Sequence, residues 1–280
     1  MTQSGQPEGW GRTAGELIRF SLPLILSGVL QQVYSWADAF IVGNVEGELA
    51  LAAIGATGTL LGFALTAVTG FTVGLSILFA QTYGRGEHGL IAKILGTFSL
   101  LLGGLCAALA AAGALLAGPL LGLLSTPPDI VDMAAAYLRV VFIGLPFLAV
   151  YNLYAAALRG LGDSRAPFLA ILVSSAVNIA LDLAFVAALG WGVTGAAAAT
   201  VISQGAMAVF LVRYGAAKHP LVRFAPGRAA FDRSALAQGF RLGLPPMIQS
   251  SVGAFGGLLL QNFMNSFGAQ TVAAITTAYR

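Results

Sequence analysis

Residues 167–189, PFLAILVSSAVNIALDLAFVAAL, decide the fold class of this chain. The apolar run is continuous, and at about 1.5 Å per residue a helix of this length crosses a bilayer core of about 30 Å. Lipid offers no partner to backbone N–H and C=O groups, so such a segment is expected to be an α-helix. Its most polar side chains, Asn178 and Asp182, lie well inside the span and require an explanation.

Similar apolar stretches recur along the whole chain. They run over residues 17–42, 50–82, 91–116, 130–158, 193–212 and 240–267, and an eighth begins near residue 269. Hydrophobic residues make up 58% of the chain and charged residues 9%, whereas a soluble domain carries roughly 25% charge. The mean hydropathy is +0.85. The sequence therefore predicts an all-α, polytopic transmembrane helical bundle whose first span is retained.

The basic residues mark alternate loops. Twelve of the fourteen Lys and Arg residues do so: Arg12, Arg19, Arg85, Lys93, Arg159, Arg165, Arg213, Lys218, Arg223, Arg228, Arg233 and Arg241. The opposite loops, 43–49, 117–129, 190–192 and the turn at Gly268, contain no Lys or Arg. Loops rich in Lys and Arg lie on the cytoplasmic side. We expect a multi-pass protein of a bacterial cytoplasmic (inner) membrane, with a cytoplasmic N-terminus, a lipid bilayer around it and no nucleic-acid partner.

An internal repeat divides the chain. FSLPLILSGVLQQ at 20–32 resembles RLGLPPMIQSSVG at 241–253, and LAAI at 51–54 is answered by VAAI at 272–275, an offset of about 221 residues. These matches predict a cytoplasmic tail (1–14), a six-helix N-lobe (15–214), a cytoplasmic linker (215–238) and the start of a second, repeated lobe (239–280). We therefore expect the chain to be C-terminally truncated, with a seventh helix and a cut eighth helix.

Two acids lie well inside the expected spans. Counted from the outer ends, Asp38 and Asp182 lie roughly 6 and 10 Å deep, at 1.5 Å per residue. Each continues a polar stripe at helical spacing, formed by Gln31, Tyr34 and Ser35 before Asp38 and by Ser174 and Asn178 before Asp182. On the sixth span Thr200 lies at a similar depth, with Ser203 and Gln204 one turn deeper.

Paired intramembrane carboxylates favour an ion-coupling role. An isolated intramembrane acid costs at least about 2.5 to 3.5 kcal/mol on insertion scales, so such residues are candidates for function. Two carboxylates held close together in a low dielectric repel each other when both are ionised, which makes uptake of H⁺ or Na⁺ switchable. The alternative is a permanently hydrogen-bonded pair that only joins helices, and Thr200 could equally bond to the backbone of its own helix.

The sequence also resembles the multidrug and toxic compound extrusion (MATE) family. The resembling pieces are LPLILSGVLQQVYSWADAFIVG (22–43), ALAAIG (50–55), LRGLGDSRAP (158–167), NIALDLAFV (178–186) and GVTGAAAATVISQ (192–204). The resemblance implies two six-helix lobes around a central cavity, and export of small organic cations in exchange for H⁺ or Na⁺. It also implies a transporter rather than an enzyme, with no cofactor beyond the coupling ion, and we expect a monomer.

The resemblance assigns roles to particular residues. Asp38, Asp182, Asn178 and Thr200 would form the cation-coupling site, which could also hold Na⁺. Pro23 would be the hinge of the first helix; the alternative is a proline that only begins the helix near its inner end. Gln31, Tyr34, Ser35, Ser174, Ser203 and Gln204 would line the substrate cavity. Aromatic side chains that could add apolar lining are Phe63, Phe142, Phe147 and Tyr151.

The seventh span departs from some branches of the family. Those branches place a second acid on this helix, whereas its long polar groups here are Gln249, Gln261, Asn262 and Asn265. This difference favours the DNA-damage-inducible branch.

Two other classes of function were weighed. A flippase for lipid-linked saccharides is expected to need several cations in its cavity, yet Arg139 is the one strong cation well inside the complete spans. An intramembrane enzyme lacks support because no nucleophile with a base partner is present and both histidines, His88 and His219, lie in loops.

Overall fold

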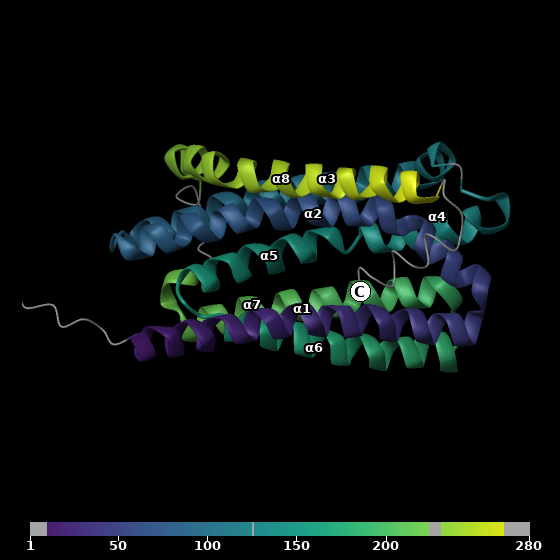
Figure 1. The fold of residues 1–280 in the computed structure, drawn as a ribbon, viewed down its shortest axis with the longest axis horizontal. Helices are drawn as coiled ribbons and strands as arrows, with labels where there is room; N and C mark the ends of the chain where they lie inside the picture. The colour runs from purple at the N-terminus through teal and green to yellow at the C-terminus, as the bar shows by residue number, and fades with distance from the viewer. Residues whose placement is uncertain (1–9, 125, 224–230, 266–280) are drawn as a thin grey trace, which may run out of the picture.

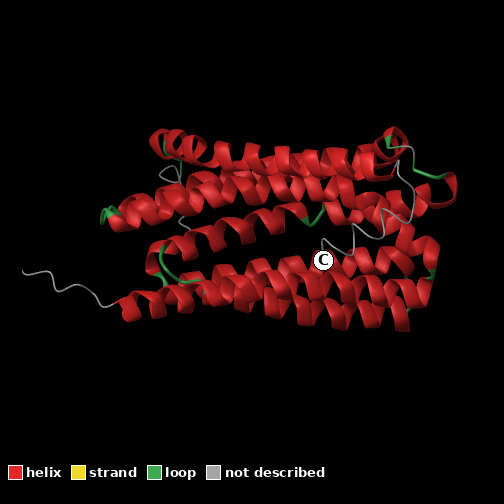
Figure 2. Ribbon diagram, viewed as in Figure 1, coloured by secondary structure: helices red, strands yellow, loops and turns green. Residues whose placement is uncertain are grey.

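The computed structural model describes residues 10–124, 126–223 and 231–265, and side chains within 13–256 apart from residues 59, 125 and 224–230. Every element in this part of the chain is helical (Figure 2). The predicted all-α class is confirmed. The elements are α1 (Trp10–Glu46), α2 (Glu48–Gly84), α3 (His88–Leu123), α4 (Pro128–Phe142), α5 (Leu145–Gly160), α6 (Arg165–Asp182), η1 (Leu183–Ala188), α7 (Gly192–Lys218), η2 (Pro220–Val222) and α8 (Arg233–Asn265).

Five helices among the described residues are long and apolar enough to cross a membrane, and six if α4 and α5 count as one bent span. The segment expected to be the seventh span folds as α8 but is not one of these six. Its polar side chains and the pair Pro245 and Pro246 explain its lower hydropathy. The polar groups Gln261, Asn262 and Asn265 and the expected eighth helix fall outside the described side chains.

The fourth apolar stretch was expected to be one continuous helix over 130–158, and that expectation is wrong. It forms α4 and α5, which are bent by 45°. Pro146 has no N–H to donate to the carbonyl of Phe142, so the helical ladder fails there. The chain tightens instead, with the N–H of Ile143 bonded to Val140 O at 3.0 Å and that of Gly144 to Val141 O at 2.9 Å.

The bundle is arranged around α5. In Figure 1, α5 runs between one group of helices, α2, α3 and α8, and another, α1, α6 and α7, and it packs against α2, α3 and α7. Its residues 151–158 are all buried. We call the end of the bundle that holds the α2–α3, α5–α6 and α7–α8 connections the basic end, because described basic residues such as Arg85, Arg165 and Lys218 lie there.

The connection between α1 and α2 needs only one residue. Gly47 adopts φ +87 between Glu46, which ends α1, and Glu48, which begins α2. This backbone region is open to glycine and strained for residues with a Cβ. The sharp turn sends α2 back across the bundle, and it leaves α1 free to pack mainly on α6.

Glycines set the distance between α2 and α8. Gly70 and Gly74 on α2 form a small-xxx-small motif, as do Gly239 and Gly243 on α8. A Cβ on Gly74 would overlap the backbone of Leu242 and Gly243, and one on Gly70 would meet that of Pro246 and Met247. The helices therefore touch backbone to backbone.

Aromatic rings close the same contact from the side. The ring of Phe71 on α2 lies 5.7 Å from that of Phe98 on α3 and 5.6 Å from that of Phe240 on α8. Each such pair stabilises the fold by roughly 0.5 to 1.5 kcal/mol beyond the contribution from burying the rings. The helix α8 is thus packed tightly on α2 and α3.

Asp232 fixes the beginning of α8. Its Oδ1 accepts the N–H groups of Ser234 at 2.8 Å and Ala235 at 3.0 Å. Its own N–H donates to Thr97 Oγ1 at 2.9 Å, and its Oδ2 lies 3.5 Å from Lys93 Nζ. The N–H bond from Ala235, followed by those from Ser234 and the neighbouring Lys93, holds the pKa of Asp232 below its usual value.

This cap makes the start of α8 sensitive to acid. A carboxylate with a lowered folded-state pKa contributes stability that is complete above the unfolded value of about 3.9 and is lost as pH falls through the folded value. We expect the amides of Ser234 and Ala235 to lose protection from hydrogen exchange, relative to their intrinsic rates, below pH ~4. Asp232→Asn keeps a good cap but not the charge, and should remove this pH dependence. Asp129→Asn, at the start of α4, is the control and should leave the pH dependence at the start of α8 unchanged. Equal pH dependence in Asp232→Asn and the wild type would contradict this account.

Candidate functional site

The two intramembrane acids come together. The carboxyl groups of Asp38 on α1 and Asp182 at the end of α6 lie side by side and interact directly. Asp182 is fully buried. Asp38 Oδ1 and both carboxyl oxygens of Asp182 are buried, and no donor in the described part of the chain satisfies them. No described Lys, Arg or His forms an ion pair with either acid.

The helical hydrogen-bonding pattern changes after Asp182. The α-helix ends there and continues as a π-helical segment, η1, in which Leu189 N bonds to Ala184 O at 2.9 Å. π-segments inside helices are rare and occur frequently at functional sites. The sequence had predicted one span over 167–189 without this irregularity.

Hydroxyl and amide groups surround the acids. Tyr34, one turn before Asp38, is within hydrogen-bonding reach of Thr200 and Ser203 on α7. The Thr200 hydroxyl donates to Ala196 O at 3.0 Å, the bond to its own helix that had been left open as an alternative. Asn178 lies one turn before Asp182, is fully buried, and has no partner for either amide atom.

Sequence reasoning missed one member of this group, Tyr137 on α4. It is buried, interacts electrostatically with Asp38, Tyr34 and Asp182, and reaches the Thr200 hydroxyl. A signal was available, since Tyr137 lies seven residues from the expected outer end of the fourth span, roughly 10 Å deep like Asp182. We call Tyr34, Asp38, Tyr137, Asn178, Asp182 and Thr200 the acid cluster.

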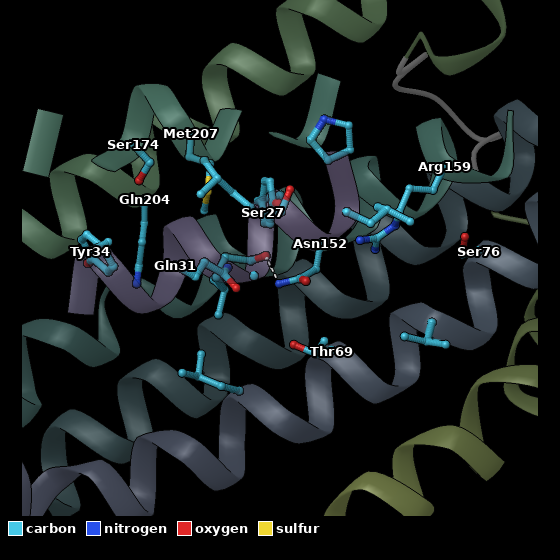
Figure 3. Close-up of a pocket in the computed structure, with 18 of the residues that line it drawn as sticks. Ser27, Gln31, Tyr34, Thr69, Ser76, Asn152, Arg159, Ser174, Gln204 and Met207 are labelled. Atoms are coloured by element: carbon cyan, nitrogen blue, oxygen red, sulfur yellow. Dashed lines mark hydrogen bonds between the residues drawn. The ribbon is translucent and has the colours of Figure 1, made fainter. Parts of the chain in front are cut away.

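A cavity of about 1020 Å³ lies next to the acid cluster, toward the basic end (Figure 3). Five of the ten residues assigned to the coupling site or the substrate cavity line it: Gln31, Tyr34, Ser35, Ser174 and Gln204. The other five, Asp38, Asn178, Asp182, Thr200 and Ser203, do not, although the carbonyl of Ser203 accepts the Ser174 hydroxyl at 3.1 Å. Ser203 was expected to line the cavity and does not, because its own hydroxyl turns to Thr200 O at 2.8 Å. Tyr34 therefore belongs to both the cavity and the acid cluster.

Gln204 enters the cavity wall at the bend between α4 and α5. A Cβ on Gly144 would overlap Gln204 Oε1, so a larger residue there would displace the end of this side chain. The same oxygen is buried without a partner. The bend between α4 and α5, which the sequence did not predict, thus accommodates the side chain of Gln204, a predicted cavity residue.

The remaining predicted residues have mixed positions. Tyr151 lines the cavity, whereas Phe63, Phe142 and Phe147 do not. Phe142 packs instead against Gly113 of α3, and Phe63 and Phe147 are exposed. Pro23 lies inside α1, where the Ser27 hydroxyl donates to Pro23 O at 2.7 Å.

Comparison with known proteins identifies relatives along most of the chain. A profile of the MatE family matches residues 23–184. The chain is 32% identical over 271 residues to the Bacillus subtilis protein described as "Probable multidrug resistance protein YpnP", covering 96% of this chain and 60% of that one. It is 33% identical over 265 residues to "Probable multidrug resistance protein YoeA" of the same organism, covering 91% and 57%.

Solved structures have the same fold. The chain superposes with a TM-score of 0.86 and 25% identity on a structure described as the outward-facing conformation of a multidrug resistance MATE family transporter, over 94% of this chain and 59% of that one. A crystal structure of MATE in complex with MaD3S gives 0.84 and 26%, over 94% and 60%. The chain spans about 60% of the length of these relatives. With a profile match over more than half of its residues, the chain belongs to the MatE family, the multidrug and toxic compound extrusion proteins that its sequence resembles.

Proposed function

We propose that the protein is a secondary active antiporter that exports small, positively charged organic substrates in exchange for H⁺ or Na⁺ by alternating access. Proteins of this family are transporters and not enzymes. The observation that carries the proposal is the pair of adjacent carboxyls, with Asp182 fully buried and no cationic partner among the described residues, beside a cavity of about 1020 Å³. Cavities of roughly 300 to 1,000 Å³ suit small organic ligands.

The acid pair requires a positive charge that the described residues do not supply. Two ionised carboxylates in contact, shielded from water, are strongly unfavourable. A bound proton or metal cation relieves this repulsion. The oxygens of Asp38, Asp182, Asn178 and Thr200 form the type of donor set that hard cations such as Na⁺ prefer. Thr200 keeps its lone pairs for this role while its proton bonds to Ala196 O.

Tyr34 connects ion binding to substrate binding. Its ring lines the cavity, while its surroundings include both acids and the hydroxyls of Thr200 and Ser203. When the ion arrives, the charge beside Tyr34 changes and the hydrogen bonds of its hydroxyl rearrange. A ligand shifts a conformational equilibrium only by binding one state better than the other. Because Tyr34 contacts both sites, the ion and the substrate can each shift the same conformational equilibrium through this side chain.

The orientation follows from charge. With the basic end in the cytoplasm, the cavity lies toward the cytoplasmic side and the acid cluster in the outer half of the membrane. Pro23 then lies in the inner part of α1, where its missing N–H weakens the ladder and lets the helix bend during the cycle. The multi-pass monomer resides in the bacterial cytoplasmic membrane, with a linker over 215–238 between its lobes, and belongs to the DNA-damage-inducible branch.

A flippase of lipid-linked saccharides receives less support from the cavity. Among the described residues that line it, one cation is present, Arg159, where such a substrate is expected to need several. Arg139 is exposed and lies elsewhere.

The test is transport by the complete gene product in proteoliposomes. A pH gradient and a Na⁺ gradient are imposed separately, and efflux of a fluorescent cationic dye is followed with and without an ionophore that collapses the gradient. One of the two gradients should accelerate efflux, and its ionophore should abolish the acceleration. Efflux that is indifferent to both gradients contradicts the proposal.

Tyr137 offers a further prediction. Tyr137→Phe removes a hydroxyl that reaches Thr200 beside the two acids, and a hydrogen bond between neutral groups is worth about 0.5 to 1.5 kcal/mol. We expect the ion concentration for half-maximal efflux to change by about two- to tenfold, with substrate binding retained. Tyr83→Phe, at the exposed end of α2, is the matched control. An unchanged ion dependence in Tyr137→Phe would remove this residue from the acid cluster.

A further inference from the structure

The cavity contains one charged side chain among the described residues that line it, and that side chain is basic. Arg159 lies in the last turn of α5, at the basic end, while Tyr34 lies at the opposite end (Figure 3). No described acid lines this cavity. A positive charge there is not explained by the export of organic cations.

No carboxylate in the described part of the chain holds Arg159. None of the described acidic side chains forms an ion pair with it. The nearest acid along the chain, Asp163, is already engaged: its Oδ1 accepts the N–H groups of Arg165 and Ala166 at 3.1 Å each, and its Oδ2 lies 2.9 Å from His219 Nε2.

Arg159 is half-buried at the end of α5 and lines the cavity. Long basic side chains near helix ends usually extend to the membrane surface. Residues 151–158, which precede Arg159, are buried, because α5 is enclosed by α2, α3 and α7. Arg139 on α4 shows the contrast, since its side chain is exposed and does not line the cavity.

Neutral polar groups share the wall with Arg159. Ser76 and Thr69 come from α2, Asn152 from α5 and Gln31 from α1, and all four line the cavity. Figure 3 shows Asn152 and Arg159 on one side of it, with Ser76 and Thr69 across from them. A guanidinium presents a planar fork of donors that matches a carboxylate or phosphate, and hydroxyl and amide groups can complete the binding.

We propose that Arg159 forms a subsite for an acidic group, carboxylate or phosphate, on an amphiphilic substrate, so that zwitterionic molecules bind better than their purely cationic analogues. The inference rests on the proposed transport function, because it names a feature of the substrate that occupies the same cavity. The apolar side chains along the wall, such as Leu148 and Ile171, would contact the rest of the amphiphile.

The test is equilibrium binding to the purified, complete gene product, without any ion gradient. The probes are tetramethylrhodamine with a free carboxylate and its methyl ester, which differ only in the acidic group. We expect the wild type to bind the carboxylate more tightly. Arg159→Gln should weaken binding of the carboxylate by about tenfold or more and leave the ester nearly unchanged. Arg159→Lys should restore part of the difference, and Arg139→Gln should preserve it fully.

Competition identifies the source of the acidic group. Displacement of the carboxylate probe by dihexanoyl phosphatidic acid, but not by dihexanoyl phosphatidylcholine or inorganic phosphate, indicates a lipid phosphate; displacement by inorganic phosphate indicates a free anion.

Three outcomes overturn the subsite: equal wild-type affinity for the two probes, equal weakening of both by Arg159→Gln, and failure of every acidic competitor. The wild-type comparison decides the matter even if the variants do not fold. Because no gradient is applied, loss of ion coupling would leave these results unchanged, so the two proposals fail separately.

Discussion

Asp182→Asn is expected to abolish gradient-driven export while leaving substrate binding measurable. The carboxamide has nearly the shape of the carboxyl group, yet it can neither release a proton nor carry the negative charge that retains Na⁺. We therefore expect gradient-driven efflux in proteoliposomes to fall to the rate measured without a gradient, and the same loss for Asp38→Asn because the two carboxyls interact directly.

Asp132→Asn provides the matched control. Asp132 lies on α4, its side chain is exposed, and its replacement makes the same change in net charge. It should leave efflux and its ion dependence unaltered. Undiminished gradient-driven efflux in both Asp38→Asn and Asp182→Asn would remove the acid pair from the coupling mechanism.

Gly74→Ala is expected to have the largest effect on stability among single methyl additions. Its Cβ would overlap the backbone of Leu242 and Gly243, and neither can move aside like the end of a flexible side chain. The helices α2 and α8 would have to separate, at a cost of roughly 1 to 3 kcal/mol for an overpacked core site. Thermal unfolding of the purified protein in detergent measures this loss.

Gly62→Ala tests the explanation on the same helix. Nothing lies within 4 Å of a Cβ at Gly62, and replacement of a helical glycine by alanine favours the helix by roughly 0.5 to 1 kcal/mol. This variant should melt at the same temperature as the wild type or slightly higher. If Gly74→Ala unfolds at the same temperature as Gly62→Ala, backbone contact does not set the distance between α2 and α8.

Much of the fold could be predicted because hydrophobicity in a membrane protein reports directly on the spans. The apolar stretches 50–82, 91–116 and 193–212 fall within α2, α3 and α7. The bend after Phe142 was not predicted, although Pro146 is visible in the sequence. Proline is tolerated in membrane helices when neighbours satisfy the freed groups, so its effect depends on tertiary contacts such as the approach of Gln204 to Gly144.

Some features of the candidate site could be predicted from the sequence, and others could not. Depth and helical spacing were enough to place Asp38 and Asp182 near each other, since both quantities follow from counting residues. They could not reveal that Tyr34 faces both the acids and the cavity, nor that the helix changes to a π-segment after Asp182, because those features depend on how α1, α6 and α7 pack. Counting residues from the outer end of the fourth span places Tyr137 at a similar depth, but an uncharged side chain was not a candidate for ion coupling.

The contact between α2 and α8 had a signal that was not used. Gly70-x-x-x-Gly74 and Gly239-x-x-x-Gly243 both read as small-xxx-small motifs in apolar segments. The repeat matches at 20–32 and 51–54 do not include Gly70 or Gly74. Read as a pair, the motifs would have predicted that the helix after the linker packs closely on the second span.

The most direct test of the central claim asks whether Asp38 and Asp182 act as one ion site. The ion exchanged on substrate binding, H⁺ release in weak buffer or displacement of radioactive Na⁺, is measured for the wild type, Asp38→Asn, Asp182→Asn and the double variant. Residues that act as a unit show non-additive effects. We predict that each single variant loses the exchange completely and that the double variant is no different. An exchange halved by each variant and lost only in the double variant would show two independent sites and contradict the account.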